Sequence, residues 1–133
     1  MEPTENKDYF ECFAFGDSSE MADELLALVL AGKKTATVSV VLEGEAKPSV
    51  GDCSLVLDGR GKPACVIKTV RLEIVPFCEL TWDMVKLEGE DETFEQWKAG
   101  NQRYWMRDAA KRGYTFTDQT PITFECFEVT EVL

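Results

Sequence analysis

Apolar side chains recur at helical spacing in the first third of the chain. They stand at Met21, Leu25, Leu28 and Val29. Residues three or four apart lie on one side of a helix, so this pattern predicts an amphipathic helix with one buried face. Ser18 or Asp17 can cap its start, and Gly32 is a natural stop.

A second, longer helix is predicted from the caps at its two ends. Thr93 and Gln96 form a capping box at the start. The helix is expected to reach about Lys111, before Gly113. Between the two helices, residues 81–87 suit a short helix, which is followed by the acidic stretch 88–92.

The remaining segments are rich in β-branched and aromatic residues. Strands are predicted at residues 35–42, 53–57 and 64–75, and from 122 to the end of the chain. The turn between the second and third strands contains Asp58-Gly59, a pair typical of hairpins. In the last strand the apolar alternation changes phase between Cys126 and Phe127, which predicts one bulge.

These elements predict an α+β fold, a small β-barrel or mixed sheet with flanking helices. The chain has 133 residues and 44% are apolar, enough for one core. We therefore expect one domain over residues 13–133, preceded by a flexible arm at residues 1–12. No apolar run is long enough to span a bilayer and the first residues do not resemble a secretory signal, so a cytoplasmic protein without membrane contact is expected.

Composition removes several classes of chemistry. The chain has no histidine, which excludes histidine-based triads and histidine metal ligands. Its five cysteines are odd in number and contain no Cys-x-x-Cys pair, so neither a disulfide framework nor a zinc site is indicated. We expect no cofactor and no metal. Any general base must be a lysine, a carboxylate, or a tuned tyrosine or cysteine.

The net charge of −11 bears on the partners. Such a surface repels phosphates at long range, which disfavours long nucleic acid. A small nucleoside-like ligand, or a short RNA in a locally basic pocket, remains compatible with it. The oligomeric state is left open.

Lys34 and Thr37 are the reactive pair at the junction of the first helix and strand. The run Gly32 to Thr35 differs from a phosphate-binding loop, because that loop leads from a strand into a helix and the order here is reversed. A lysine near a helix C-terminus is also favoured by the helix dipole alone, which is the structural explanation for Lys34. On the residues alone, that explanation is the simpler one.

The same run carries a family resemblance. The chain resembles ASCH-domain proteins, whose hallmark is Gly-x-Lys-x-x-Thr-x-Arg after the first helix. Gly32, Lys34 and Thr37 match this hallmark, and Ser39 stands where it has arginine. Further similar segments stand, in order, at residues 15–18, 50–52, 75–77 and 88–90 and in the closing strand.

This resemblance implies a PUA-like fold and suggests a function. Some small members are amidohydrolases that remove the acetyl group from N4-acetylcytidine through a Lys, a Thr and a Glu. The matching positions are Lys34, Thr37 and Glu90, with Glu88 as the rival of Glu90. Thr37 would attack the amide carbonyl and neutral Lys34 would take its proton. If Lys34 stays charged, it would instead stabilise the oxyanion, with Glu90 as the base.

The long helix offers candidate substrate-binding residues. Arg103, Arg107 and Lys111 fall four apart and form one basic stripe. Trp105 could stack on a base, and Ser39 would face the ligand in place of the hallmark arginine. The alternative is that the aromatic residues belong to the core and the arginines to a solvated face.

Two other functions are weighed against the hydrolase. A non-catalytic module that binds RNA or a modified nucleotide would bind without turnover, and a single-strand ribonuclease would need carboxylate, lysine or metal chemistry. The acidic residues 88–92 lack the spacing and internal glycine of an EF-hand, which favours a solvated loop over a metal site.

Overall fold

The computed structural model describes residues 9–133. It contains the following elements: β1 Cys12–Phe13, α1 Ser19–Leu30, β2 Ala36–Val40, β3 Cys53–Leu57, β4 Pro63–Pro76, α2 Trp82–Val85, α3 Phe94–Arg112 and β5 Pro121–Val132, with short 3-10 turns at Phe77–Glu79 (η1) and Lys86–Glu88 (η2). The predicted α+β class is confirmed.

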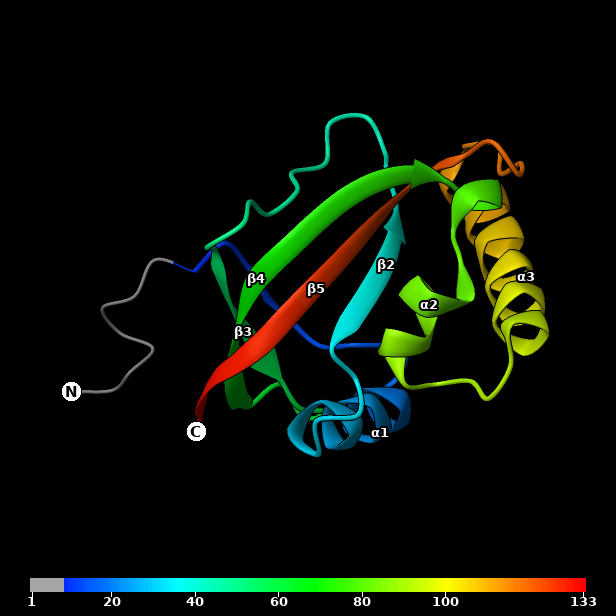
Figure 1. The fold of residues 1–133 in the computed structure, drawn as a ribbon. Helices are drawn as coiled ribbons and strands as arrows, with labels where there is room; N and C mark the ends of the chain where they lie inside the picture. Colours follow the sequence, from blue (N-terminus) through cyan, green and yellow to red (C-terminus); the bar gives the residue numbers. More distant parts are fainter. Residues whose placement is uncertain (1–8) are drawn as a thin grey trace.

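The five strands form one mixed sheet in the order β1-β3-β4-β5-β2. β1 runs parallel to β3, and the other neighbours are antiparallel. The sheet is not closed in the described part of the chain, so of the two predicted alternatives, a small barrel or a mixed sheet, the structure has the mixed sheet. Figure 1 shows the long strands β4 and β5 crossing the molecule, with α1 at one end and α3 beyond β2.

Paired backbone begins earlier than residue 13. The Phe10 amide donates to the Cys53 carbonyl (2.8 Å), and β1 pairs with β3. The predicted arm over residues 1–12 thus contains paired backbone at Phe10 and the first residue of the edge strand β1, and its residues 1–8 lie outside the described part of the chain.

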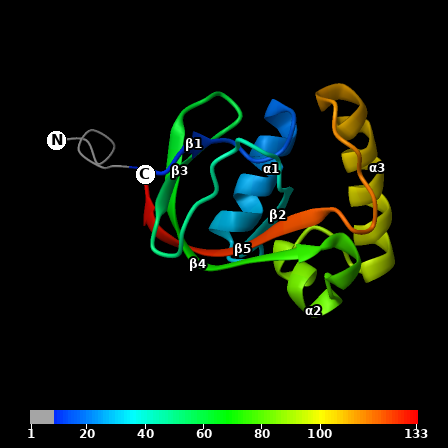
Figure 2. The same ribbon diagram turned by 90° about the horizontal axis from the view of Figure 1, so that it is seen from above.

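Two hydrophobic clusters pack on the sheet. In the first, Ala36, Ile122 and Phe124 meet η1, α2 and α3 through Phe77, Val85, Trp97 and Trp105. In the second, α1 contributes Leu26 and Val29, which pack with Val56, Ile67 and Phe127. The view from above shows β4 and β5 bending past α1 toward α2 and α3 (Figure 2).

The buried face of α1 differs from the predicted one. Its buried residues are Ala22, Leu26 and Val29, whereas Met21 is largely exposed. Ser18 is the N-cap and accepts a hydrogen bond from the Met21 amide (3.1 Å). The capping prediction is confirmed, and the buried stripe is rotated by about one residue.

Register in the β4–β5 ladder shifts at two points rather than one. The pairing skips Val70 on β4 and Thr130 on β5. Alternation therefore places Thr123, Glu125 and Phe127 on one face of β5, and Ile122 and Phe124 on the other. The change of phase at Cys126 arises because the two clusters cover opposite faces of this strand.

Candidate functional site

The turn after α1 aims Lys34 into the protein. α1 ends at Leu30, and Gly32 has φ +77, a left-handed conformation that suits glycine. The amides of Lys33 and Lys34 both donate to the Leu28 carbonyl, at 2.9 and 3.1 Å. Thr35 then joins the turn to η2, because its amide donates to the Leu87 carbonyl (2.8 Å).

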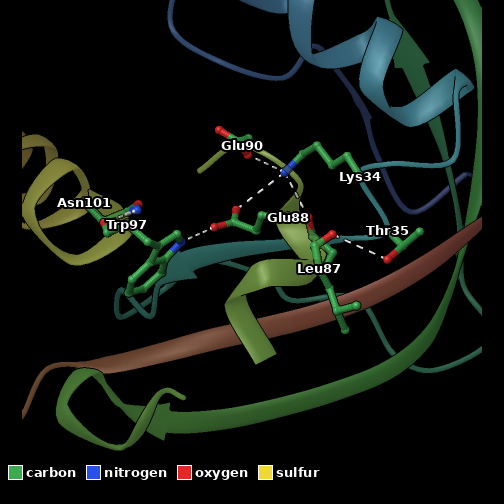
Figure 3. Close-up of polar contacts among 8 residues, drawn as sticks. Lys34, Thr35, Leu87, Glu88, Glu90, Trp97 and Asn101 are labelled. Carbon is green, nitrogen blue, oxygen red and sulfur yellow. Dashed lines mark hydrogen bonds and ion pairs between the residues drawn. The ribbon is translucent and has the colours of Figure 1, made fainter. Parts of the chain in front are cut away.

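The Lys34 ammonium has three acceptors. It donates to a carboxylate oxygen of Glu90 at 2.6 Å, to the Ala36 carbonyl at 2.9 Å and to Glu88 at 3.5 Å (Figure 3). The Phe15 ring lies below it, with its centroid 5.4 Å from Nζ. Lys34 is only 1% exposed. A buried ammonium with two carboxylates is a paired charge and not a solvated helix-end lysine.

Glu88 is the deepest carboxyl group of the cluster. It is 6% exposed, and Trp97 Nε1 donates to its other oxygen (2.6 Å). Burial raises the pKa of Glu88 to about 7. The positive charge of Lys34 lowers this pKa, and the negative charge of Glu90 raises it further. Its protonation therefore changes near neutral pH. The interpretation of residues 88–92 as a solvated loop is wrong for Glu88.

Gly89 brings the two glutamates close to the lysine turn. It has φ +71, and a Cβ atom there would lie 2.3 Å from the Lys33 carbonyl oxygen. Only glycine combines that backbone angle with such a close approach. The loop and the helix–strand corner, more than fifty residues apart, are thereby held together.

A hollow of about 390 Å³ opens beside Glu90. Its walls come from the start of α1, from β2, from the loop after Gly89 and from α3: Gly16, Asp17, Met21, Leu25, Val38, Glu90, Asp91, Gly100, Asn101, Tyr104 and Arg107. The Glu90 side chain is 32% exposed and covers Lys34 on this side. Glu90 thus links the buried ammonium to a space large enough for a small ligand.

The structure brings some predicted site residues together and separates others. Lys34 and Glu90 are in direct contact, and Arg107 lines the same hollow as Glu90. Thr37 and Ser39 line a different hollow, with Thr123 and Glu125. Among the described residues, no hydrogen bond joins Thr37 to Lys34 or Glu90.

The two other substrate-binding candidates do not line the hollow beside Glu90. Trp105 is 4% exposed and belongs to the first hydrophobic cluster. This agrees with the alternative prediction that the aromatic residues of the helix belong to the core. Arg103 is exposed on α3. A ligand beside Glu90 would therefore meet Tyr104 and Arg107 on the helix rather than Trp105 and Arg103.

Sequence reasoning missed two supports of the cluster. Trp97 is not among the predicted site residues, yet its indole nitrogen donates a hydrogen bond to Glu88. Asn101 donates to the Trp97 carbonyl (2.9 Å) and lines the hollow. A tryptophan nine residues after a buried glutamate carries no local signal, because only the tertiary fold brings them together. Among the described residues, no group of three acidic or cysteine side chains could hold a metal ion.

Comparisons with known proteins agree with this architecture. A family model described as the ASCH domain matches residues 11–131. A crystal structure of protein EF3133 from Enterococcus faecalis V583 is 29% identical, with a TM-score of 0.84 over 96% of this chain and 84% of that one. A search of curated proteins finds no match.

Two more distant structures share the fold. An ASCH domain from Lactobacillus crispatus JV V101 is 24% identical, with a TM-score of 0.86 over 92% of this chain and 80% of that one. The hypothetical protein PH0355 is 14% identical, with a TM-score of 0.60 over 90% of this chain and 97% of that one.

Among the described residues, no helix has the length and apolar character needed to cross a bilayer.

Proposed function

Because the chain belongs to the ASCH-domain family, we propose that it is a small amidohydrolase that removes an acyl group from a nucleoside-like amine such as N4-acetylcytidine. The contact between the buried Lys34 ammonium and Glu90, at the edge of a ligand-sized hollow, carries the proposal. It provides a fixed positive charge and a partly accessible carboxylate in one place. Acyl transfer needs both.

The proposed reaction uses water as the nucleophile. Glu90 takes a proton from a water molecule whose oxygen attacks the acyl carbonyl. As the substrate carbonyl displaces Glu90 from Nζ, the Lys34 ammonium stabilises the negative charge that develops on oxygen. The C–N bond then breaks, and Glu90 returns the proton to the leaving amine. The products are a carboxylic acid and the free amine.

Charged Lys34 suits the role of oxyanion stabiliser. Two carboxylates and a carbonyl oxygen already accept hydrogen bonds from its Nζ, so a negatively charged substrate oxygen can take the place of one of these acceptors. Thr37, the nucleophile that the family resemblance implies, would have to reach the acyl carbon from the other face of β2. The proposal therefore gives the attack to water.

The hollow offers groups that could hold the rest of the substrate. The exposed ring of Tyr104 could stack on a base, and the Asn101 amide and the Arg107 guanidinium could bond to ring or sugar oxygens. Arg107 is also the one member of the predicted substrate-binding set that lines this space.

Release of cytidine from N4-acetylcytidine, followed by chromatography, tests the proposal. Glu90→Gln keeps the shape and removes the base, so kcat should fall by roughly a hundredfold or more. Glu92→Gln, an exposed change in the same loop, is the control and should retain activity. Thr37→Val should also retain activity, and its inactivity would transfer the attack to Thr37.

Full activity of Glu90→Gln would refute the mechanism. Binding of N4-acetylcytidine without any release of cytidine would instead identify the domain as a binding module for modified nucleotides or short RNA. That outcome has a structural basis, because Lys34 is covered by Glu90 and would be reached only after Glu90 moves.

A further inference from the structure

A second hollow lies between the two edge strands of the sheet, β1 and β2. It is on the face of β2 opposite to the hollow beside Glu90. Its volume is about 510 Å³. Its lining comes from β1 and two residues that precede it, from β2 and the segment after it, and from β5: Phe10, Glu11, Phe13, Thr37, Ser39, Glu45, Ala46, Lys47, Pro48, Thr123 and Glu125. It shares no residue with the hollow beside Glu90.

Thr123 supplies an unsatisfied polar atom in this hollow. The residue is 3% exposed, and its Oγ1 has no hydrogen-bond partner. A buried hydroxyl left without a partner costs about 1–3 kcal/mol, so buried polar groups without partners are rare in folded proteins. The hydroxyl is covered in this conformation, so a ligand in the hollow would satisfy it after rotation of the Thr123 side chain about χ1.

Carboxylates dominate the charge of the same hollow. Glu125 accepts a hydrogen bond from Thr69 Oγ1 (2.7 Å), and Glu11 and Glu45 line the space with it. Burial and the charge of Glu11 raise the pKa of Glu125, and burial and Glu45 raise that of Glu11. Lys47 is the opposing cation of the lining. A bound cation would relieve the repulsion among the carboxylates.

The remaining walls favour an organic cation over a metal ion. No group of three acidic side chains in the described chain lies close enough to hold a metal. Phe10 and Phe13 provide apolar aromatic surface beside the carboxylates. A guanidinium group suits this combination, because it is planar, stacks on aromatic rings and donates several N–H bonds to carboxylate and hydroxyl oxygens.

We propose that the hollow between β1 and β2 binds a small organic cation of the guanidinium type, which donates hydrogen bonds to Glu125 and Thr123. Ser39 leaves room for it, since this residue lines the hollow with a short side chain. The proposal is independent of the hydrolase chemistry at Lys34 and Glu90.

Titration with methylguanidinium chloride, followed by amide chemical shifts, tests this site. We expect saturable shifts at residues 37, 39, 123 and 125. Tetramethylammonium, which has the charge without N–H donors, and urea, which has the donors without the charge, should bind much more weakly. Equal binding of either compound, or no saturable shifts with methylguanidinium, would overturn the proposal.

Variants locate the binding. Glu125→Gln keeps an acceptor for Thr69 and should weaken binding roughly tenfold or more, because a hydrogen bond to a charged group is lost. Thr123→Val nearly conserves volume and should weaken binding several-fold. Ser39→Arg should block it by placing a guanidinium in the hollow. Glu92→Gln is the control.

The test separates misfolding from lost binding. Amide shifts outside the hollow report whether each variant is folded, and Thr123→Val serves if Glu125→Gln does not fold. Unchanged affinity in a folded Glu125→Gln or Thr123→Val variant would refute the assignment.

Discussion

Glu88 should make the stability of the protein fall as pH rises from about 4.5 to 7. Its carboxyl has an ordinary pKa of 4.5 in the unfolded chain and a pKa of about 7 in the folded one. Below pH 4.5 both states hold the proton. Between these values the folded state holds it and the unfolded state has lost it, so each rise in pH favours unfolding.

The size of this effect follows from the two pKa values. Each pKa unit corresponds to about 1.4 kcal/mol, which gives a penalty of about 3 kcal/mol once the pH exceeds 7. Glu88→Gln removes the titration and keeps an oxygen that can accept the Trp97 indole hydrogen bond. The difference in unfolding free energy between wild type and variant should therefore change by about 3 kcal/mol between pH 4.5 and pH 8.

Urea unfolding at a series of pH values measures this difference. Many other carboxyl groups titrate in the same range, so the comparison is between variants and not between absolute profiles. Glu92→Gln, exposed in the same loop, removes one carboxyl and should run parallel to the wild type. Parallel profiles for wild type and Glu88→Gln would refute the argument that Glu88 titrates near neutral pH.

Three other variants test the supports of the site. Lys34→Met should destabilise the protein by about 3–5 kcal/mol in urea unfolding at pH 8, above the pKa of Glu88, because it leaves a buried carboxylate without its cation. Exposed Lys86→Met is the control, and an equal loss in both would contradict the ion-pair argument. Gly89→Ala should lower the melting temperature clearly more than Gly113→Ala. Both glycines have positive φ, but only at Gly89 would the added Cβ lie within 3 Å of backbone atoms, those of Lys33. Similar losses would show that the contact with the Lys33 carbonyl is unimportant. Thr93→Ala should lower the free energy of unfolding by about 1 kcal/mol, because it removes the N-cap of α3. The Thr93 hydroxyl accepts a hydrogen bond from the Gln96 amide at 3.1 Å. An unchanged free energy would mean that the cap is dispensable.

Local signals predicted the elements well. The caps Ser18 and Thr93 begin α1 and α3, and Gly113 with φ +80 ends α3. These signals act through backbone hydrogen bonds within a few residues, so the sequence shows them directly. The α+β class follows from the order of the elements.

Features that depend on which face is covered were harder to predict. Met21 fits the helical spacing of α1, yet Ala22 is the residue that is buried. The phase change at Cys126 was interpreted as a bulge in β5, whereas both faces of that strand are covered, by different helices. Periodicity detects a buried face, but it cannot tell two partly buried faces from a shift in register.

The candidate site was partly visible in the sequence. Residue type and the family hallmark indicated Lys34 and Glu90, and the two residues are in contact. The positions of Glu88 and Thr37 could not be inferred in the same way. Glu88 is buried where it accepts a hydrogen bond from Trp97, a contact made only by the tertiary fold, and the face to which Thr37 points depends on where β2 begins.

Lys34 also protects an edge of the sheet. β2 is an edge strand of the sheet. Just before it, the Thr35 carbonyl accepts a hydrogen bond from the Phe127 amide of β5. Carbonyls alternate in direction along a strand, so the next one, that of Ala36, points away from the sheet. Unpaired edge carbonyls can template the addition of a strand from another molecule. The ammonium occupies this one at 2.9 Å. A variant without Lys34 therefore leaves this edge carbonyl free to pair with another molecule, and it also loses a charge. Its activity and stability should be compared at several protein concentrations.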